Sequence, residues 1–190
     1  MNIIQGISSL LIGYLFGCFQ TSYFISRLVL KKDIREMGSG NAGASNITSE
    51  LGWKYGFLTG VADVFKAYIP AQLVLYIFPG ALQQNNIMAL AGTGAVLGHI
   101  YPFFLNFRGG KGVACYIGML LAINWQIGIA FIIGLILITI ITDYISVGDE
   151  NVMDYDGCRV QGNNCLDPPI CQGDGYCPEI AMTSYIIIWY

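Results

Sequence analysis

The sequence predicts an all-α integral membrane protein, a polytopic helical bundle with about five transmembrane helices. Of its 190 residues, 55% are hydrophobic and 11% are charged, whereas soluble domains carry about 25% charged residues. The hydrophobic residues also gather in long runs, and a run of about 20 such residues can span a bilayer. The apolar runs cover residues 3–30, 53–78, 87–107, 112–125 and 126–142.

The first three runs are each long enough to form a transmembrane helix. We expect the first to be a retained helix, not a cleaved signal peptide. Met1 and Asn2 provide no basic segment, and the run exceeds the apolar core of a signal peptide. The fourth run is short and meets the fifth near Asn124 and Trp125, where we expect a break between two helices.

The charge pattern predicts an orientation in the membrane. Basic residues gather between Arg27 and Arg35 and again between Arg108 and Lys111. These two segments lie two spans apart, so they lie on the same side of the membrane. The positive-inside rule assigns that side to the cytoplasm and the N-terminus to the outside. The net charge of −3, together with membrane burial, argues against a nucleic-acid partner.

Two glycine-rich loops are the strongest candidates for a substrate site. The first loop, residues 38–46, reads Gly-Ser-Gly-Asn-Ala-Gly-Ala-Ser-Asn. Glycine permits positive φ and close approach to a ligand, and consecutive backbone N–H groups can bind an anion. The second loop, residues 108–112, reads Arg-Gly-Gly-Lys-Gly and adds two cations. Together the loops predict a cytoplasmic site for a pair of phosphorylated substrates.

Three ionisable side chains near these loops are further candidates. Asp63 and Lys66 lie three residues apart in an apolar run, so they share a helix face and should point into the bundle or a polar cavity. The alternative for this pair is a neutralising ion pair with no other role. His99 is the only histidine and precedes the second loop, which favours acid–base or substrate contact over the commoner structural role.

Several site classes are not indicated by the sequence. The second loop lacks the first glycine of a Walker A motif, and Lys111 is followed by Gly112 where that motif has Ser or Thr. The membrane segments show no His, Cys and Asp set with metal-ligand spacing, so we expect no metal or other cofactor. The sequence contains no Gly-x-Ser-x-Gly motif, and Ser39 has no base close to it in sequence.

A series of motifs resembles the bacterial acyl-phosphate:glycerol-3-phosphate acyltransferase family, PlsY. The resemblance covers residues 1–148 and places the motifs in the family's order. Its members are small inner-membrane proteins with seven spans. The motifs are Asp33-Ile34-Arg35, the first loop, Asp63-x-x-Lys66, Gly98-His99-x-x-Pro102 and Phe107-Arg108-Gly109-Gly110-Lys111-Gly112-Val113-Ala114.

This resemblance implies a function in phospholipid biosynthesis. The chain would move a fatty acyl group from acyl phosphate to the 1-position of glycerol 3-phosphate, giving lysophosphatidic acid and phosphate. The family uses no acyl-CoA, acyl carrier protein or metal in this step. Its partners would be the two substrates and the lipid bilayer, while the oligomeric state stays open.

The resemblance also implies roles for individual residues. Acyl phosphate is already activated, so the protein mainly positions the substrates and stabilises charge, with Lys111 on the leaving phosphate. No general base can be identified, and a substrate phosphate could take that role. The catalytic candidates are Ser39, His99 and Lys111. The substrate-binding candidates are Gly38, Gly40, Asn41, Asn46, Lys66, Arg108, Gly109, Gly110 and Gly112.

The chain also departs from the family pattern. Ser49 stands where the family usually has a substrate-binding arginine, and Ala67 stands where a glycine usually follows the lysine. The resemblance ends after Gly148, so the domain at 1–148 lacks the family's last two spans and C-terminal motif. These departures leave an alternative open, namely a non-catalytic membrane protein that binds a phosphorylated lipid or a small anion.

The C-terminal tail, residues 149–190, has a different composition. It is acidic, rich in Gly, Asn and Pro, and predicted to be irregular. Four cysteines would indicate a disulfide scaffold in an extracellular chain, but the predicted topology starts the tail in the cytoplasm. Their spacing does not match common zinc motifs. The tail is therefore either a frameshifted, truncated or mispredicted end or a grafted small Cys-rich module. The cysteines are Cys158, Cys165, Cys171 and Cys177.

Overall fold

The structure, a computed structural model, describes residues 2–79, 84–142, 152–153, 159–161 and 164–165. The chain divides into two compact units, Met1–Ser146 and Val147–Tyr190. Of the four tail cysteines, Cys165 lies within the described residues, whereas Cys158, Cys171 and Cys177 lie outside them.

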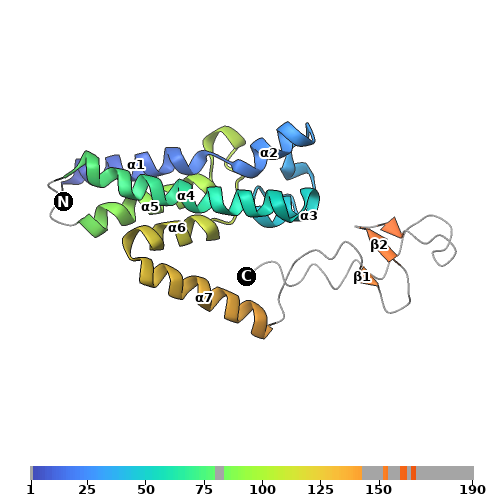
Figure 1. Cartoon of the computed structure of the whole chain (residues 1–190). Helices are drawn as coiled ribbons and strands as arrows, with labels where there is room; N and C mark the ends of the chain where they lie inside the picture. Colours follow the sequence, from blue (N-terminus) through green and yellow to red (C-terminus); the bar gives the residue numbers. More distant parts are fainter. Residues whose placement is uncertain (1, 80–83, 143–151, 154–158, 162–163, 166–190) are drawn as a thin grey trace. The chain divides into compact units, whose positions relative to one another are not determined.

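The first unit is a bundle of α-helices, which confirms the predicted fold class. Three segments, at 3–29, 53–77 and 84–105, are long and apolar enough to cross a membrane, and two shorter apolar helices follow. Helix α5 packs along α1 and α4, and α6 packs against α4 and α5 (Figure 1). The helices are α1 (Ile3–Cys18), α2 (Thr21–Val29), α3 (Ala44–Leu51), α4 (Trp53–Ile77), α5 (Gln84–Ile100), α6 (Val113–Ile123) and α7 (Trp125–Thr142), with short 3₁₀ turns η1 (Ile34–Glu36) and η2 (Phe103–Leu105).

The predicted break near Asn124 is present, because α6 ends at Ile123 and α7 begins at Trp125. The Asn124 side chain stabilises the new helix start. Its Oδ1 accepts hydrogen bonds from the backbone N–H groups of Gln126 and Ile127, at 2.9 and 3.2 Å. These bonds satisfy two of the backbone donors that a helix start leaves without an intrahelical partner.

The first apolar run contains a break that the sequence does not predict. We expected one continuous helix, but α1 ends at Cys18 and α2 begins at Thr21. Phe19 and Gln20 between them have extended backbones, with ψ of 107° and 94°. Such a break removes intrahelical hydrogen bonds, so the freed backbone groups need partners from elsewhere in the bundle.

The described residues of the second unit form a small antiparallel sheet. Its strands are β1 (Val152–Met153), β2 (Arg159–Gln161) and β3 (Asn164–Cys165), in the order β1-β2-β3. Val152 pairs with Val160, and Val160 pairs with Cys165. The sequence, which indicates an irregular tail, does not predict these short strands.

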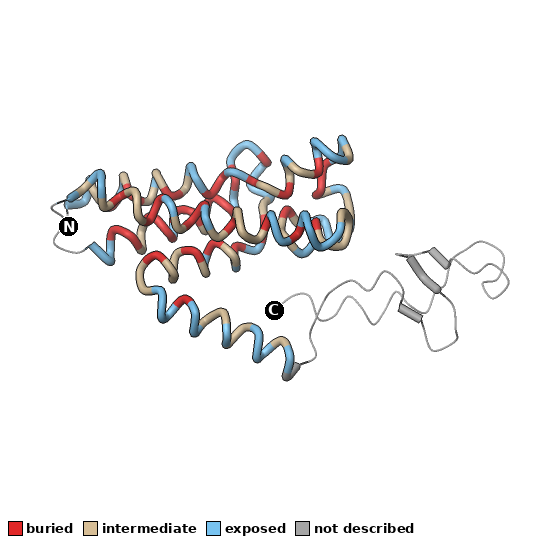
Figure 2. The backbone as a smooth tube through the Cα atoms, viewed as in Figure 1, coloured by how far each residue is buried: buried red, intermediate tan, exposed pale blue. Residues whose placement is uncertain are grey.

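Glycines allow the bundle helices to approach closely. A Cβ atom at Gly13 or Gly17 of α1 would overlap the carbonyl oxygen of a residue on α5. The reverse also holds, because a Cβ at Gly94 or Gly98 of α5 would overlap a carbonyl oxygen of α1. Small residues four apart on both helices are a common packing device in membranes. Figure 2 shows the buried positions concentrated along these helices and α4, while α7 is mostly exposed or intermediate.

A Gly13→Ala substitution should therefore destabilise the bundle. The new methyl group would meet the Ala91 backbone, which cannot rotate away, and overpacking of this kind costs about 1–3 kcal/mol. We expect a lower midpoint of thermal unfolding in detergent. The matched control is Gly134→Ala on α7, where the added Cβ meets nothing within 4 Å. The control should keep or raise the midpoint, because alanine favours a helix over glycine. Equal midpoints for the two variants would contradict the close α1–α5 contact.

Candidate functional site

The first loop is built around the side chain of Asn46, which is 2% exposed. Its Nδ2 donates to the carbonyl oxygens of Ile34, Met37 and Asn41 at 3.0, 3.1 and 2.9 Å. Its Oδ1 accepts from the backbone N–H of Ser39 at 2.9 Å. All polar atoms of this amide are therefore engaged within the chain. The geometry favours a positioning role for Asn46. It would support the expected substrate binding by holding the loop backbone in place.

Two glycines let the first loop turn around this amide. Gly38 and Gly40 have φ of 50° and 71°, a region that side chains other than glycine rarely adopt. A Cβ at Gly38 would also overlap the Oδ1 of Asn46. Ser39 lies between them and is exposed. The loop therefore keeps its fixed contacts inside and presents the Ser39 hydroxyl at the surface.

The second loop lies on the end of α5. The backbone N–H groups of Gly109 and Gly110 donate to the carbonyl oxygens of Ile100 and His99, both at 3.0 Å. A Cβ at Gly109 would overlap the His99 carbonyl oxygen, and a Cβ at Gly110 would overlap His99 Nε2. These positions require glycine because the loop backbone rests directly on the histidine.

The cations of the second loop remain available to a ligand. Arg108 and Lys111 are both exposed, while Gly110 between them is buried. Gly112, with φ of 81°, turns the chain into the start of α6. Helix N-termini carry unpaired N–H groups and a partial positive charge, which suit a phosphate. The second loop thus places two exposed positive charges beside the backbone donors at the start of α6.

A buried ion pair lies beneath this loop. Asp63 and Lys66 are 2% and 6% exposed, which confirms that the pair faces the bundle interior. The Lys66 Nζ lies 2.8 Å from Asp63 Oδ1, 2.6 Å from His99 Nδ1 and 2.8 Å from the carbonyl oxygen of Phe19. This last bond satisfies a carbonyl at the break between α1 and α2. With three acceptors around its ammonium, Lys66 fits a structural role better than the expected contact with substrate.

His99 is enclosed in the same way and is 3% exposed. Because Nδ1 faces the Lys66 ammonium, it acts as the acceptor, which leaves the ring proton on Nε2 against Gly110. Its carbonyl oxygen accepts from the Gln20 amide at 2.8 Å and from the Gly110 N–H at 3.0 Å. Both ring nitrogens and the carbonyl face protein groups. This geometry favours a positioning role over the catalytic role that we expected for His99.

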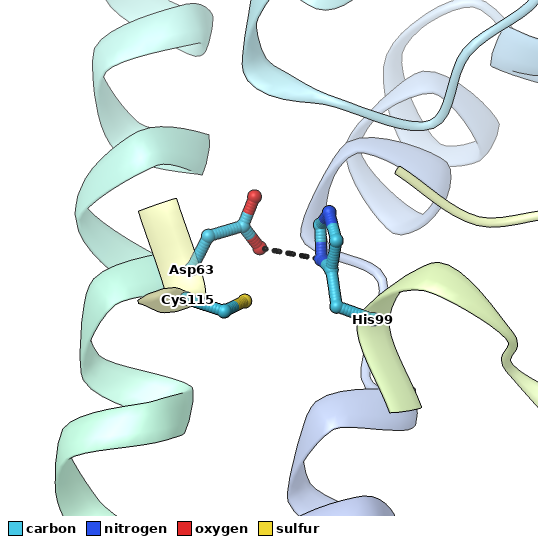
Figure 3. Close-up of side chains that lie close together, drawn as sticks. All are labelled: Asp63, His99 and Cys115. Atoms are coloured by element: carbon cyan, nitrogen blue, oxygen red, sulfur yellow. Dashed lines mark ion pairs between the residues drawn. The ribbon is translucent and has the colours of Figure 1, made fainter. Parts of the chain in front are cut away.

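Three potential metal ligands meet in this buried region. The side chains of Asp63, His99 and Cys115 approach one another from α4, α5 and α6 (Figure 3), and their ligand atoms lie within 4.8 Å of each other. The dashed pair in the figure joins Asp63 Oδ1 and His99 Nδ1 at 3.7 Å. Sequence spacing could not reveal this set, because each residue lies on a different helix. The Lys66 ammonium already supplies a positive charge here, so the cluster fits a lysine-centred ion pair.

Arg35 links the segment before the first loop to the turn before the second loop. Its guanidinium donates to the Asp33 carboxylate and, through Nη1, to the carbonyl oxygen of Leu105 at 2.7 Å. Leu105 ends η2, three residues before Arg108. Sequence reasoning gave no role to Arg35, although it lies in a quoted motif. It also missed Gln20, whose only signal was a polar side chain inside the first apolar run.

The structure thus separates the expected site residues into two groups. One group is buried and holds the backbone, and the other is exposed on the loops. The buried group comprises Asn46, Lys66, His99, Gly110 and Gly112; the exposed group comprises Gly38, Ser39, Gly40, Arg108 and Lys111; Asn41 and Gly109 lie between the two groups and are half-buried.

Loss of the buried ammonium should be costly. Lys66→Met leaves the Asp63 carboxylate without its partner, and an uncompensated buried charge costs about 3–5 kcal/mol. We expect a large drop in the thermal unfolding midpoint in detergent, with partial recovery in the Asp63→Asn/Lys66→Met double variant. Lys54→Met is the control, because Lys54 is exposed on the same helix. If the single variant were as stable as the parent, the ion pair would not support the bundle.

Comparison with known proteins agrees with the motif pattern. A family model described as glycerol-3-phosphate acyltransferase matches residues 7–153. Glycerol-3-phosphate acyltransferase 1 of Oceanobacillus iheyensis is 42% identical over 142 residues, which cover 73% of this chain and 68% of the relative. The glycerol-3-phosphate acyltransferase of Thermosipho melanesiensis is 43% identical over 144 residues, covering 76% and 68% of the two chains.

Solved structures show the same likeness. The crystal structure of PlsY (YgiH), an integral membrane glycerol 3-phosphate acyltransferase, in its glycerol 3-phosphate form matches with a TM-score of 0.63 and 33% identity. The match covers 71% of this chain and 66% of that chain. Its lysophosphatidic acid form matches with a TM-score of 0.60 and 33% identity, over 70% and 64% of the chains. The matched region thus spans about two thirds of these relatives. By its sequence motifs, its helical bundle and these matches, the chain belongs to the glycerol-3-phosphate acyltransferase family.

Proposed function

We propose that this membrane protein transfers a fatty acyl group from acyl phosphate to the 1-position of glycerol 3-phosphate. The observation that carries the proposal is the pair of loops with exposed polar and cationic side chains, joined through Arg35, in a chain of this family. The related crystal structures are of a glycerol 3-phosphate form and a lysophosphatidic acid form. These two molecules are a substrate and a product of the proposed reaction.

The reaction needs little covalent chemistry from the protein. The 1-hydroxyl oxygen of glycerol 3-phosphate attacks the acyl carbonyl carbon, and the bond from that carbon to the phosphate oxygen breaks. The phosphate leaves with the bonding electrons, and the hydroxyl proton passes to a phosphate oxygen. The products are lysophosphatidic acid and inorganic phosphate. The protein contributes by aligning the two substrates and by stabilising the negative charge that develops.

The exposed residues of the loops are suited to these tasks. Lys111 and Arg108 supply positive charge for the leaving phosphate, and the start of α6, directly after the second loop, supplies backbone N–H donors. In the first loop, Ser39 and the backbone around Gly40 contact the small alcohol substrate. Asn41 completes this loop, because its carbonyl accepts from the buried Asn46 amide. Asn46, Lys66 and His99 act from beneath by holding the loops.

The position of the loops at the ends of membrane helices suits one water-soluble substrate and one with a long apolar chain. Glycerol 3-phosphate is soluble and can reach loops at the membrane surface from water, whereas the acyl chain stays among the helices. The positive-inside pattern supports a cytoplasmic position for both loops and an outer N-terminus. We accordingly place the chain in the bacterial inner membrane. The resemblance to the acyl-phosphate-dependent family supports acyl phosphate as the donor. It also supports a transfer step without a metal or other cofactor.

A non-catalytic anion-binding protein is the alternative, and the comparisons do not favour it because the relatives are named as acyltransferases. The deciding test uses the purified chain in detergent with acyl phosphate and labelled glycerol 3-phosphate. Formation of labelled lysophosphatidic acid supports the enzyme. Binding of the label without product would support the alternative.

Lys111→Ala should abolish most of this transfer. The substitution removes the charge placed on the leaving phosphate, and loss of one such stabilising group typically costs about 100- to 1,000-fold in rate. Lys54→Ala is the matched control, since Lys54 is also exposed but lies at the start of α4. Initial rates of lysophosphatidic acid formation provide the measurement. A variant that kept most of the parent rate would remove Lys111 from the phosphate site.

A further inference from the structure

Arg35 joins two segments that lie 70 residues apart in the chain. Its Nη1 donates to the carbonyl oxygen of Leu105 at 2.7 Å. That carbonyl also accepts from the backbone N–H of Arg108 at 3.2 Å. A single oxygen therefore connects Arg35 to the first residue of the second loop. Leu105 itself is 3% exposed, and the bond to it is partly buried.

The turn that receives this bond has an unfavourable backbone. Asn106 and Phe107 have φ of 54° and 58°, which places two consecutive non-glycine residues in the left-handed region. Such residues rarely adopt this conformation, and it persists only where surrounding contacts determine it. Within the turn, the carbonyl oxygen of Pro102 accepts from the N–H groups of Leu105 and Phe107, both at 3.1 Å. Arg35 adds a contact from a distant part of the chain.

The Arg35 side chain is itself held in one geometry. Its Nε and Nη2 donate to the two Asp33 carboxylate oxygens at 3.1 and 2.7 Å, a forked pair that only arginine can make. These bonds lower the pKa of Asp33 below its ordinary value of 3.8, so the carboxylate is charged at neutral pH. Arg27 lies 3.8 Å from the same carboxylate, and the Arg35 guanidinium lies over the Tyr23 ring at 5.8 Å.

The other end of this segment is fixed to the first loop. Between Asp33 and Arg35, the carbonyl oxygen of the fully buried Ile34 accepts from the Asn46 amide at 3.0 Å. The same amide binds the backbone N–H of Ser39. Hydrogen bonds, together with the peptide link from Ile34 to Arg35, therefore connect Ser39 through Asn46 and Arg35 to the backbone of Arg108.

We propose that Arg35 is a positioning residue that sets the placement of the second loop relative to the first. This inference rests on the proposed acyl transfer, since it assigns the two substrates to the two loops. The reaction requires the glycerol hydroxyl and the acyl carbonyl to meet within bonding reach, so a small shift between loops lowers the rate of transfer more than the binding of either substrate. Arg35 acts through Leu105 and does not touch the substrates.

The test compares Arg35→Gln and Arg35→Lys with Lys32→Gln. Lys32 is an exposed cation in the same basic link, so its loss removes the same charge without the bonds to Asp33 and Leu105. The kinetic readout is kcat and KM for glycerol 3-phosphate in detergent. The structural readout is hydrogen exchange by mass spectrometry on peptides covering 33–41 and 103–110.

We expect Arg35→Gln to lower kcat about tenfold or more, with a much smaller change in KM. Exchange should become faster in 103–110 while α1 and α4 stay protected. Arg35→Lys should also lower kcat, because a compact ammonium lacks the three separate nitrogens with which the guanidinium reaches both Asp33 oxygens and the Leu105 carbonyl. Lys32→Gln should match the parent in both readouts.

Three results would overturn the proposal: parent-like kcat and exchange in Arg35→Gln, faster exchange throughout the helices, or a full return of kcat in Arg35→Lys. An inactive parent chain would instead count against the proposed function. The exchange comparison at 103–110 would still decide whether Arg35 holds the turn, so the two failures are distinguishable.

Discussion

The ammonium of Lys66 is the contact on which the site depends most. It joins α4 to the carbonyl left free at the break between α1 and α2, and to the ring of His99 at the end of α5. Removing an ammonium from water is expensive, so a buried lysine needs both a counter-charge and further hydrogen-bond acceptors. Here Asp63 balances the charge, and the two other acceptors complete the surroundings. The helix break and the buried lysine therefore require each other.

This arrangement divides the work between two layers of residues. The buried layer, centred on Lys66 and Asn46, fixes backbone carbonyl and N–H groups and is almost completely enclosed. The exposed layer consists of Ser39, Arg108 and Lys111 on glycine-rich backbone. The proposed donor, acyl phosphate, is already activated, so alignment and charge stabilisation would suffice for transfer of its acyl group. The buried layer serves the alignment of the substrates by holding the loop backbone, and the exposed cations serve charge stabilisation.

Much of the fold follows from simple features of the sequence. Long apolar runs predicted the membrane helices, and the polar Asn124 between two such runs marked the start of α7. The break at Phe19 and Gln20 escaped prediction, because neither residue is a helix breaker and the partners that stabilise it come from α4 and α5. The short helix α3 was missed as well, since its first residues belong to the glycine-rich loop.

The residue types of the candidate site could be predicted from the sequence, but the contacts between them could not. Glycines and cations marked both loops, and the spacing of Asp63 and Lys66 predicted an inward-facing pair. What the sequence could not give is which polar groups meet. The contacts of Lys66 with His99, and of Arg35 with Leu105, join residues 33 and 70 positions apart. Helix packing determines long-range contacts of this kind, so the spacing of residues along the chain does not predict them.

The glycines of the second loop connect the two layers directly. The Gly110 backbone rests on the ring of His99, with no side chain to act as a spacer, and its N–H binds the His99 carbonyl. A movement of His99 would therefore displace the backbone that carries Lys111. The ring is held in turn by the Lys66 ammonium, so the place of an exposed cation is fixed by a charge buried inside the bundle. Through this contact, the inward-facing Lys66 can influence the proposed acyl transfer without reaching the substrate.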